Sequence, residues 1–153
     1  MRNAEQHGTA LGQVFELAVL MNEDMTQSLA RDGLTVARAH LLWELQQRGP
    51  STQRILAEAL DVSPRNITGL VDGLVATGFV TREPHPTDRR ATLVSFTEHG
   101  ARSAKEMDKG RGELAELLFA DMSDRKFNGL VLGLEAVLDR LKAELAKQKG
   151  ERP

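Results

Sequence analysis

Residues 51–97 read STQRILAEALDVSPRNITGLVDGLVATGFVTREPHPTDRRATLVSFT, and this stretch decides the fold. Its first part predicts a short helix from Thr52 to Leu60, with Ser51 as the N-cap, because apolar residues recur there at helical spacing. Asp61-Val62 then forms a tight turn. The stretch therefore begins as a helix followed by a turn.

A second helix follows that turn. Ser63 is expected to be its N-cap, and Pro64 takes the first helical position, where the missing N–H of proline costs no hydrogen bond. Gly78 marks the end of the helix, since glycine tolerates the left-handed backbone found at helix C-termini. The residues expected on the buried face are Ile67, Leu70, Val71, Leu74 and Val75.

The period of the pattern changes after this helix. Phe79 to Arg82 is typical of a short strand, and Ala91 to Phe96, with its alternating β-branched residues, is typical of a returning strand. The two prolines of Pro84–Asp88 favour a turn between them. The expected fold class is therefore mainly α with a small β-hairpin wing, that is, a winged helix-turn-helix.

This order of elements predicts an interface for double-stranded DNA. In a helix-turn-helix the second helix lies in the major groove with its N-terminal residues toward the bases. Arginine pairs there with guanine, asparagine pairs with adenine, and the helix N-terminus attracts phosphate. The alternative is that these residues are only the polar face of an amphipathic helix. The candidate DNA-binding residues of the helix are Ser63, Pro64, Arg65, Asn66 and Thr68.

The hairpin tip carries a second group of candidates, Asp88, Arg89 and Arg90. An arginine on a thin projecting tip suits insertion into the narrow minor groove, where the electrostatic potential is most negative. A carboxylate two residues away can hold the guanidinium in one orientation. The alternative is an exposed turn with a weak local ion pair.

Helical patterns flank the winged module. Leu11 to Leu29 carries a broad apolar stripe, and Thr35 is the expected N-cap of a helix that ends at Gly49-Pro50. Downstream, Thr97 and Ser123 are expected to cap two long helices.

The terminal helices predict a homodimer. They carry more apolar surface than a short winged core can cover, and two-fold packing of two copies is the commonest solution. We expect residues 1–33 and 98–153 to form the dimerisation region and residues 34–97 the DNA-binding region. The alternative is that the helices fold back on their own core.

Composition narrows the function classes. The chain has 153 residues, 41% hydrophobic and 27% charged, with a net charge of -2 and no cysteine, which excludes disulfides and thiol chemistry. The histidines have no metal-ligand spacing, and neither a nucleophile elbow nor a phosphate-binding glycine motif is present, so we expect no metal, no cofactor and no enzyme activity. No apolar run is long enough to cross a membrane and residues 1–12 lack a secretory apolar segment, so a cytoplasmic location is expected.

The stretch from Ile67 to Gly100 resembles the core signature of the MarR family of transcriptional regulators. The matching parts are the recognition helix, a Gly-hydrophobic-Val step, an Asp-x-Arg wing and a Thr-x-x-Gly entry into the next helix. Leu34-Thr35 and the helix at Ile55–Leu60 match as well. The resemblance covers about residues 11–145.

The resemblance implies a winged-helix homodimer that binds a pseudo-palindromic operator and acts as a transcriptional regulator, most simply a repressor. It implies that Arg90 enters the minor groove with Asp88 as its orienting partner, whereas Arg89, at the variable position, is assigned to the phosphate backbone. Gly69 departs from the pattern, because many relatives carry a longer polar side chain there.

Two other functions compete with this expectation. One is a helical protein-interaction module with weak or lost DNA binding, favoured by the five arginines and five carboxylates that cancel within residues 51–97. The other is a small enzyme, against which the missing catalytic motifs argue.

Many members of the family are released from DNA by small phenolic or anionic aromatic effectors that bind between the dimerisation and DNA-binding regions. In this chain Phe15, His40 and Trp43 are candidates to line such a site, with Arg38 or His40 as the polar anchor. The alternative is that Phe15 and Trp43 belong to the core and His40 is a half-exposed helix residue.

Overall fold

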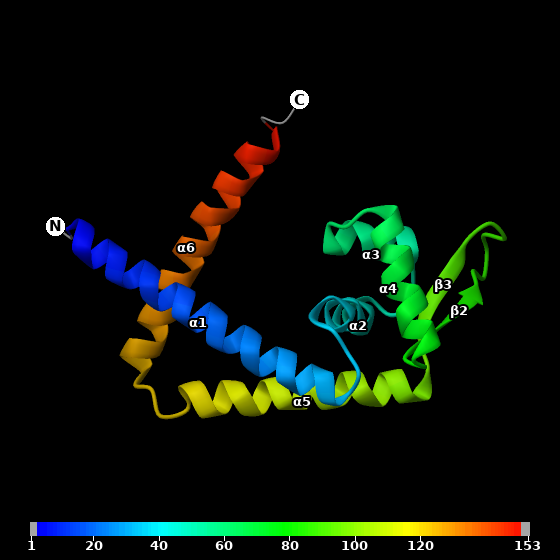
Figure 1. The fold of residues 1–153 in the computed structure, drawn as a ribbon, viewed down its shortest axis with the longest axis horizontal. Helices are drawn as coiled ribbons and strands as arrows, with labels where there is room; N and C mark the ends of the chain where they lie inside the picture. Colours follow the sequence, from blue (N-terminus) through cyan, green and yellow to red (C-terminus); the bar gives the residue numbers. More distant parts are fainter. Residues whose placement is uncertain (1–2, 151–153) are drawn as a thin grey trace. The chain divides into compact units, whose positions relative to one another are not determined.

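The computed structural model describes residues 3–150 as a mostly helical chain with one small sheet (Figure 1). Residues 1–2 and 151–153, which the predicted dimerisation region includes, lie outside the described residues. The described residues divide into two compact units between Met107 and Asp108. The elements are α1 (Ala4–Arg31), α2 (Val36–Arg48), β1 (Ser51–Thr52), α3 (Gln53–Leu60), α4 (Pro64–Ala76), β2 (Val80–Pro84), β3 (Thr92–Phe96), α5 (Glu98–Phe119) and α6 (Asp124–Gly150).

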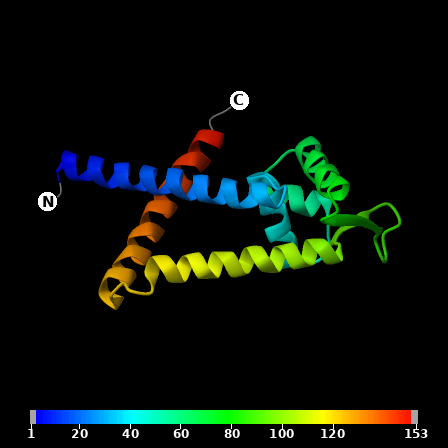
Figure 2. The ribbon, with the colours of Figure 1, turned by 60° about the horizontal axis from the view of Figure 1, so that its bottom comes forward.

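The first unit contains the winged helix-turn-helix that the sequence predicts. The β2–β3 hairpin is antiparallel, with Val80 opposite Phe96 and Pro84 opposite Thr92. The tip of this hairpin projects beyond α3 and α4 in both views (Figures 1 and 2). The mainly α class with a β-hairpin wing is therefore confirmed.

The sheet has a third strand that the sequence analysis missed. Ser51 pairs with Val94 and Thr52 pairs with Leu93, so that the strand order is β1-β3-β2. Thr52 rather than Ser51 is consequently the N-cap of α3, and its hydroxyl accepts a hydrogen bond of 3.3 Å from the Ile55 backbone N–H. The predicted cap was wrong by one residue because Ser51 is held by a partner about forty positions away, which a local pattern cannot reveal.

The other predicted helix starts and ends are mostly confirmed. Thr35 caps α2 by accepting a hydrogen bond of 3.3 Å from the Arg38 backbone N–H. The helix ends at Gly49, whose φ of 77° is a conformation that glycine adopts without steric cost. The Thr97 hydroxyl accepts a bond of 3.0 Å from the Gly100 N–H at the start of α5. The first helix, expected over residues 11–29, is longer and begins at Ala4.

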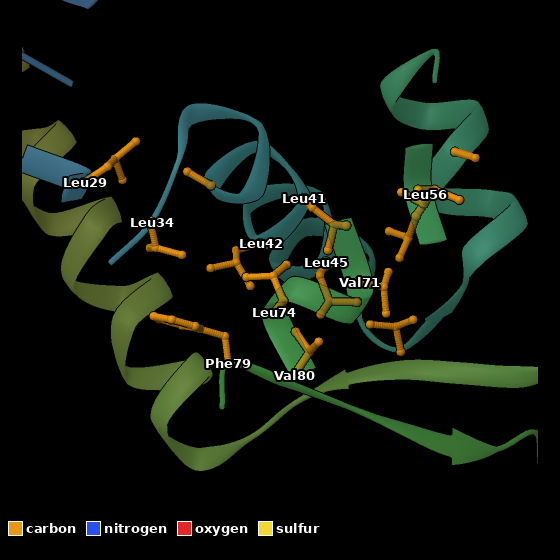
Figure 3. Packing of buried hydrophobic residues seen from close by; sticks show 14 residues of the cluster. Leu29, Leu34, Leu41, Leu42, Leu45, Leu56, Val71, Leu74, Phe79 and Val80 are labelled. Atoms are coloured by element: carbon orange, nitrogen blue, oxygen red, sulfur yellow. The ribbon is translucent and has the colours of Figure 1, made fainter. Parts of the chain in front are cut away.

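The core of this unit lies between α2, α3, α4 and the sheet (Figure 3). Its fully buried side chains each contribute about 1.5–3 kcal/mol relative to exposure. Val75 was expected in the core but is exposed, and Leu70 is half-buried, because only the narrower stripe of Ile67, Val71 and Leu74 faces inward. The largest fully buried side chains are Leu41, Leu42, Leu45, Leu56, Ile67, Leu74, Val71, Val80 and Val94.

The long helices carry apolar side chains that the chain itself leaves exposed. In α1 only Leu29 is buried, and Figure 2 shows most of that helix running away from α2–α4. In the second unit, α6 has no buried residue. The exposed apolar residues of α6 are Phe127, Val131, Leu132, Leu134, Val137, Leu138, Leu141 and Leu145.

Candidate nucleic-acid interface

The turn between α3 and α4 is built by local hydrogen bonds. Asp61 ends α3 in the left-handed conformation with a φ of 52°, and the Val62 backbone N–H donates to the Ala57 carbonyl at 3.0 Å. Ser63 then caps α4, because its hydroxyl accepts a 3.1 Å bond from the Asn66 backbone N–H. Pro64 occupies the first turn of α4 as predicted. The N-terminus of α4 is thereby fixed at the surface.

The residues at this N-terminus are exposed, as an interface requires. Arg65 and Asn66 are exposed, whereas the next residue, Ile67, is only 2% exposed and packs in the core. Neither side chain makes a hydrogen bond or an ion pair to any described residue. A guanidinium and a carboxamide with unused donors can therefore form new hydrogen bonds, such as those to base edges in a major groove.

Thr68 differs from the other predicted contact residues, because its hydroxyl is already in use. The hydroxyl donates to the Pro64 carbonyl at 2.9 Å and accepts from Gln53 Nε2 at 3.1 Å. The side chain is exposed, but these two bonds hold the first turn of α4 and tie it to α3. A DNA contact by Thr68 stays a prediction.

The wing tip is ordered by the ring of His85. Its Nδ1 accepts hydrogen bonds from the backbone N–H groups of Thr87, at 3.2 Å, and Asp88, at 3.0 Å. The tip is closed by backbone bonds from the His85 N–H to the Ala91 carbonyl and from the Ala91 N–H to the Asp88 carbonyl. The loop that carries the candidate arginines is thus a defined turn.

Asp88, Arg89 and Arg90 are all exposed at this tip. The Asp88 carboxylate accepts a hydrogen bond of 3.0 Å from the Arg90 backbone N–H. Within the described residues neither arginine forms an ion pair, so the expectation that Asp88 holds the guanidinium directly is not met. Asp88 instead orients the backbone from which the Arg90 side chain extends.

A polar network that the sequence analysis did not find links the wing to the helices. Arg82 of β2 forms an ion pair of 2.5 Å with Asp72 of α4. Arg82 also donates from Nε, at 3.1 Å, and from Nη2, at 3.0 Å, to Oε1 of Gln53. Gln53 in turn donates to Thr68. The partners are 10 to 29 residues apart in sequence, so no local pattern could have indicated them.

The four candidate effector residues are not brought together by a common contact. Phe15 lies on α1 and is 63% exposed, whereas Trp43 on α2 is 42% exposed. His40, also on α2, is exposed. The alternative that Phe15 and Trp43 belong to the core of the chain is therefore wrong, whereas their contact with an effector stays a prediction. Arg38 is half-buried, and its guanidinium lies against Gly73 of α4.

Other kinds of site have less support. A shallow depression of about 340 Å³ is lined by Asp32, Arg102, Ser103, Lys105 and Glu106, and contains none of the four effector candidates. Among residues 3–150 there is no cluster of three or more histidine or carboxylate side chains able to hold a metal ion. Nor does any helix in that range have the length and apolarity needed to cross a membrane.

Comparison with curated proteins finds transcriptional regulators. An HTH-type transcriptional regulator of Mycobacterium leprae is 35% identical over 94 residues, which are 61% of this chain and 66% of the relative. The HTH-type transcriptional repressor NicR of Pseudomonas putida is 30% identical over 106 residues, which are 69% of this chain and 67% of NicR. The chain spans 60–66% of the length of three mycobacterial regulators that it matches, the Mycobacterium leprae protein among them.

Solved structures share the fold. The reduced form of MarR from E. coli aligns with a TM-score of 0.69 and 25% identity, over 84% of this chain and 96% of that one. FabT of Streptococcus pneumoniae, solved in complex with DNA, aligns with a TM-score of 0.78 over 92% of this chain and 99% of that one, and its 16% identity supports the fold alone. The profile of the MarR family matches residues 34–92, from two residues before α2 to the first residue of β3. This chain therefore belongs to the MarR family.

Proposed function

We propose that the protein is a DNA-binding transcriptional repressor that holds a pseudo-palindromic operator as a homodimer in the cytoplasm. The observation that carries the proposal is the pairing of two exposed elements in one module. The N-terminus of α4 presents Arg65 and Asn66 with unused donors, and the wing tip presents Arg89 and Arg90 without ion pairs among residues 3–150. DNA binding by a winged helix-turn-helix needs two parts, which are a recognition helix for the major groove and a wing for the minor groove.

The repressor role draws on relatives. NicR, which aligns over most of its length, is described as a transcriptional repressor, and so is YetL of Bacillus subtilis. A repressor needs only to occupy its operator, so it requires no interaction surface beyond those for DNA and for the second subunit.

The dimer is supported by the apolar faces of the long helices. A 27-residue helix such as α6 cannot leave eight large apolar side chains in water at no cost, because each square ångström of apolar surface buried contributes about 25 cal/mol. α1 and the C-terminal end of α5 carry exposed apolar residues of the same kind, including Phe15 and Leu117. We assign residues 1–33 and 98–153 to the interface between two copies, which presents two recognition helices to one duplex.

An effector site is the finer part of the proposal, and Arg38 supports it. Its half-buried guanidinium makes no ion pair or side-chain hydrogen bond to any described residue, and it lies against the recognition helix at Gly73. An anion bound to Arg38 would sit beside α4 and bias the placement of that helix. A small aromatic acid fits this chemistry, and contact of its ring with Trp43 or Phe15 stays a prediction.

The effector proposal is tested by thermal shift with a series of aromatic acids and their uncharged amides. The acids should raise the melting temperature of the wild type, and Arg38→Gln should lose that response. Equal shifts by the acids and the amides would show that no anion site is involved.

DNA binding is tested by fluorescence anisotropy on a labelled duplex from directly upstream of the coding sequence, at two salt concentrations. Arg90→Ala should weaken binding by about 1–3 kcal/mol if the side chain enters the minor groove. Arg102→Ala is the matched control, because Arg102 is an exposed arginine of α5 already paired with Glu98 at 3.1 Å. If no upstream fragment binds below micromolar protein at low salt, the protein-interaction module becomes the better account.

A further inference from the structure

Gln53 stands where three elements of the proposed DNA interface meet. It is the first residue of α3, directly after the Thr52 cap, and it is half-buried. Its Oε1 accepts both hydrogen bonds from Arg82 of the wing strand β2, and its Nε2 donates to Thr68 of the recognition helix α4. A single carboxamide therefore uses its acceptor toward the wing and its donor toward the recognition helix.

The geometry of the sheet explains why Arg82 reaches this point. Side chains two apart on a strand lie on one face, and Val80, two residues before Arg82, is buried in the core beneath α4. Arg82 is the next residue on that face toward the tip, opposite Val94 in the register. The hydrogen bonds and the ion pair of Arg82 therefore hold the wing at its middle, between the buried Val80 at its base and the tip at residues 85–91.

Arg82 itself is poorly placed to serve as a free phosphate contact. Its side chain is only 32% exposed, and its charge is offset by Asp72 at 2.5 Å. Two of its nitrogen atoms already donate to Gln53. The cluster is therefore better suited to hold two elements in a fixed relation than to bind a ligand.

We propose that Gln53 is a positioning residue that fixes the wing against the recognition helix, so that Arg90 and the N-terminus of α4 reach their two grooves together. The inference rests on the proposed DNA-binding function and extends it. A wing already held in its bound orientation loses less conformational freedom on binding, and affinity rises accordingly. Without the carboxamide the hairpin beyond Val80 keeps its own strand pairing and the ion pair between Arg82 and Asp72, but it loses the bridge from Arg82 through Gln53 to Thr68 of α4.

The test is a double-mutant cycle between Gln53→Met and Arg90→Ala, measured by anisotropy on the upstream duplex. Methionine keeps the length of the side chain and removes both the donor and the acceptor. Gln53→Met alone should weaken binding by roughly 3- to 10-fold, the range that one or two hydrogen bonds supply. In the Arg90→Ala background the same change should cost clearly less, because the misplaced wing then carries only Arg89 to the DNA.

Gln47→Met is the matched control. Gln47 is an exposed glutamine of α2 whose side chain bonds to no residue in the range 3–150, and the substitution should leave affinity unchanged. If Gln53→Met costs the same in both backgrounds, or costs no more than Gln47→Met, the positioning role is overturned. If the wild type binds no upstream fragment, the proposed DNA-binding function is refuted, and the inference that rests on it is refuted too. If the wild type binds but the losses of the two substitutions simply add, only the positioning role of Gln53 is refuted.

A second measurement requires no DNA. Amide hydrogen exchange should be faster at the wing-tip N–H groups of His85 and Ala91 in Gln53→Met than in the wild type, with the melting temperature nearly unchanged. Unchanged exchange at these two amides would overturn the proposal independently of any binding result.

Discussion

Gly100 offers the sharpest test of the packing, because the structure leaves no room for even one more carbon atom. This buried residue of α5 lies against the chain at the entrance to β2. A Cβ placed on Gly100 would stand 2.8 Å from the carbonyl carbon of Phe79, closer still to its oxygen, and 3.1 Å from Cδ1 of Phe96. The nearest obstacle is backbone, which cannot turn aside as a flexible side chain can.

The same Phe79 carbonyl is tied into the helix start. It accepts a hydrogen bond of 3.1 Å from the Thr97 N–H, and the Thr97 hydroxyl donates to the Gly78 carbonyl at 2.6 Å. Separating α5 from Phe79 to admit a methyl group would therefore strain these bonds as well. Overpacking of this kind costs about 1–3 kcal/mol, and a backbone obstacle places Gly100→Ala at the upper end.

The gain in helix propensity from glycine to alanine offsets about 1 kcal/mol of that cost. The net loss expected for Gly100→Ala is therefore about 2 kcal/mol, which corresponds to a fall in melting temperature of roughly 4–8 °C for a chain of this size. Gly110→Ala is the control, since Gly110 lies in the same helix and a Cβ there meets no atom within 4 Å. Its melting temperature should rise by roughly 2–4 °C.

The assay is thermal unfolding followed by circular dichroism, at one fixed protein concentration because the stability of a dimer depends on concentration. A lower melting temperature for Gly100→Ala and a higher one for Gly110→Ala would separate the effect of side-chain packing from that of helix propensity, because both substitutions lie in α5. If Gly100→Ala melts together with Gly110→Ala, or above the wild type, the argument from the Phe79 carbonyl is refuted.

Four further outcomes are expected. Arg65→Ala should relax the preference for one base in each half-site of sequences selected from a random library, and a uniform loss across all sequences would mean that Arg65 touches only phosphate. Leu138→Asp should yield monomers by light scattering, whereas a surviving dimer would move the interface away from α6. His85→Ala should speed amide exchange at Thr87, and His85→Asn should restore protection, because its side-chain oxygen can replace Nδ1 as acceptor; equal exchange in both variants would contradict this role. With three unpaired interface arginines in each subunit, log K should fall against log salt with a slope of about -5, and a slope near zero would show that these arginines make no phosphate contacts.

Much of the fold could be predicted because its signals are local. Thr35 and Ser63 mark helix starts by a hydroxyl that bonds three residues ahead, and Gly78, with a φ of 82°, marks the end of a helix. The strand pattern of residues 91–96 and the prolines before it predict the hairpin within a few residues. Such features depend on neighbours in the chain, and the sequence displays those neighbours directly.

The errors and omissions have the opposite origin. Three features depend on partners 10 to 43 positions away, which only the folded chain brings near. They are the pairing of Ser51 with β3, the hydrogen bonds of Gln53 and the ion pair of Arg82. Asp88 shows a subtler limit. Its spacing from Arg90 permits either a bond to the guanidinium or a bond to the backbone N–H, and the closed turn around His85 selects the second.

The charge of the module shows why position matters more than composition. Residues 51–97 carry five arginines and five carboxylates, a balance that favours weak or lost DNA binding if charge is only counted. The structure separates these arginines into two groups. Arg54 and Arg82 are paired with carboxylates, at 3.2 Å and 2.5 Å, whereas the remaining three form no ion pair within the described residues. Those three lie exposed at the start of α4 and at the wing tip, the two places that we propose contact DNA. A neutral module can therefore present a locally positive surface at each predicted contact, since pairing cancels charge only where the partners meet.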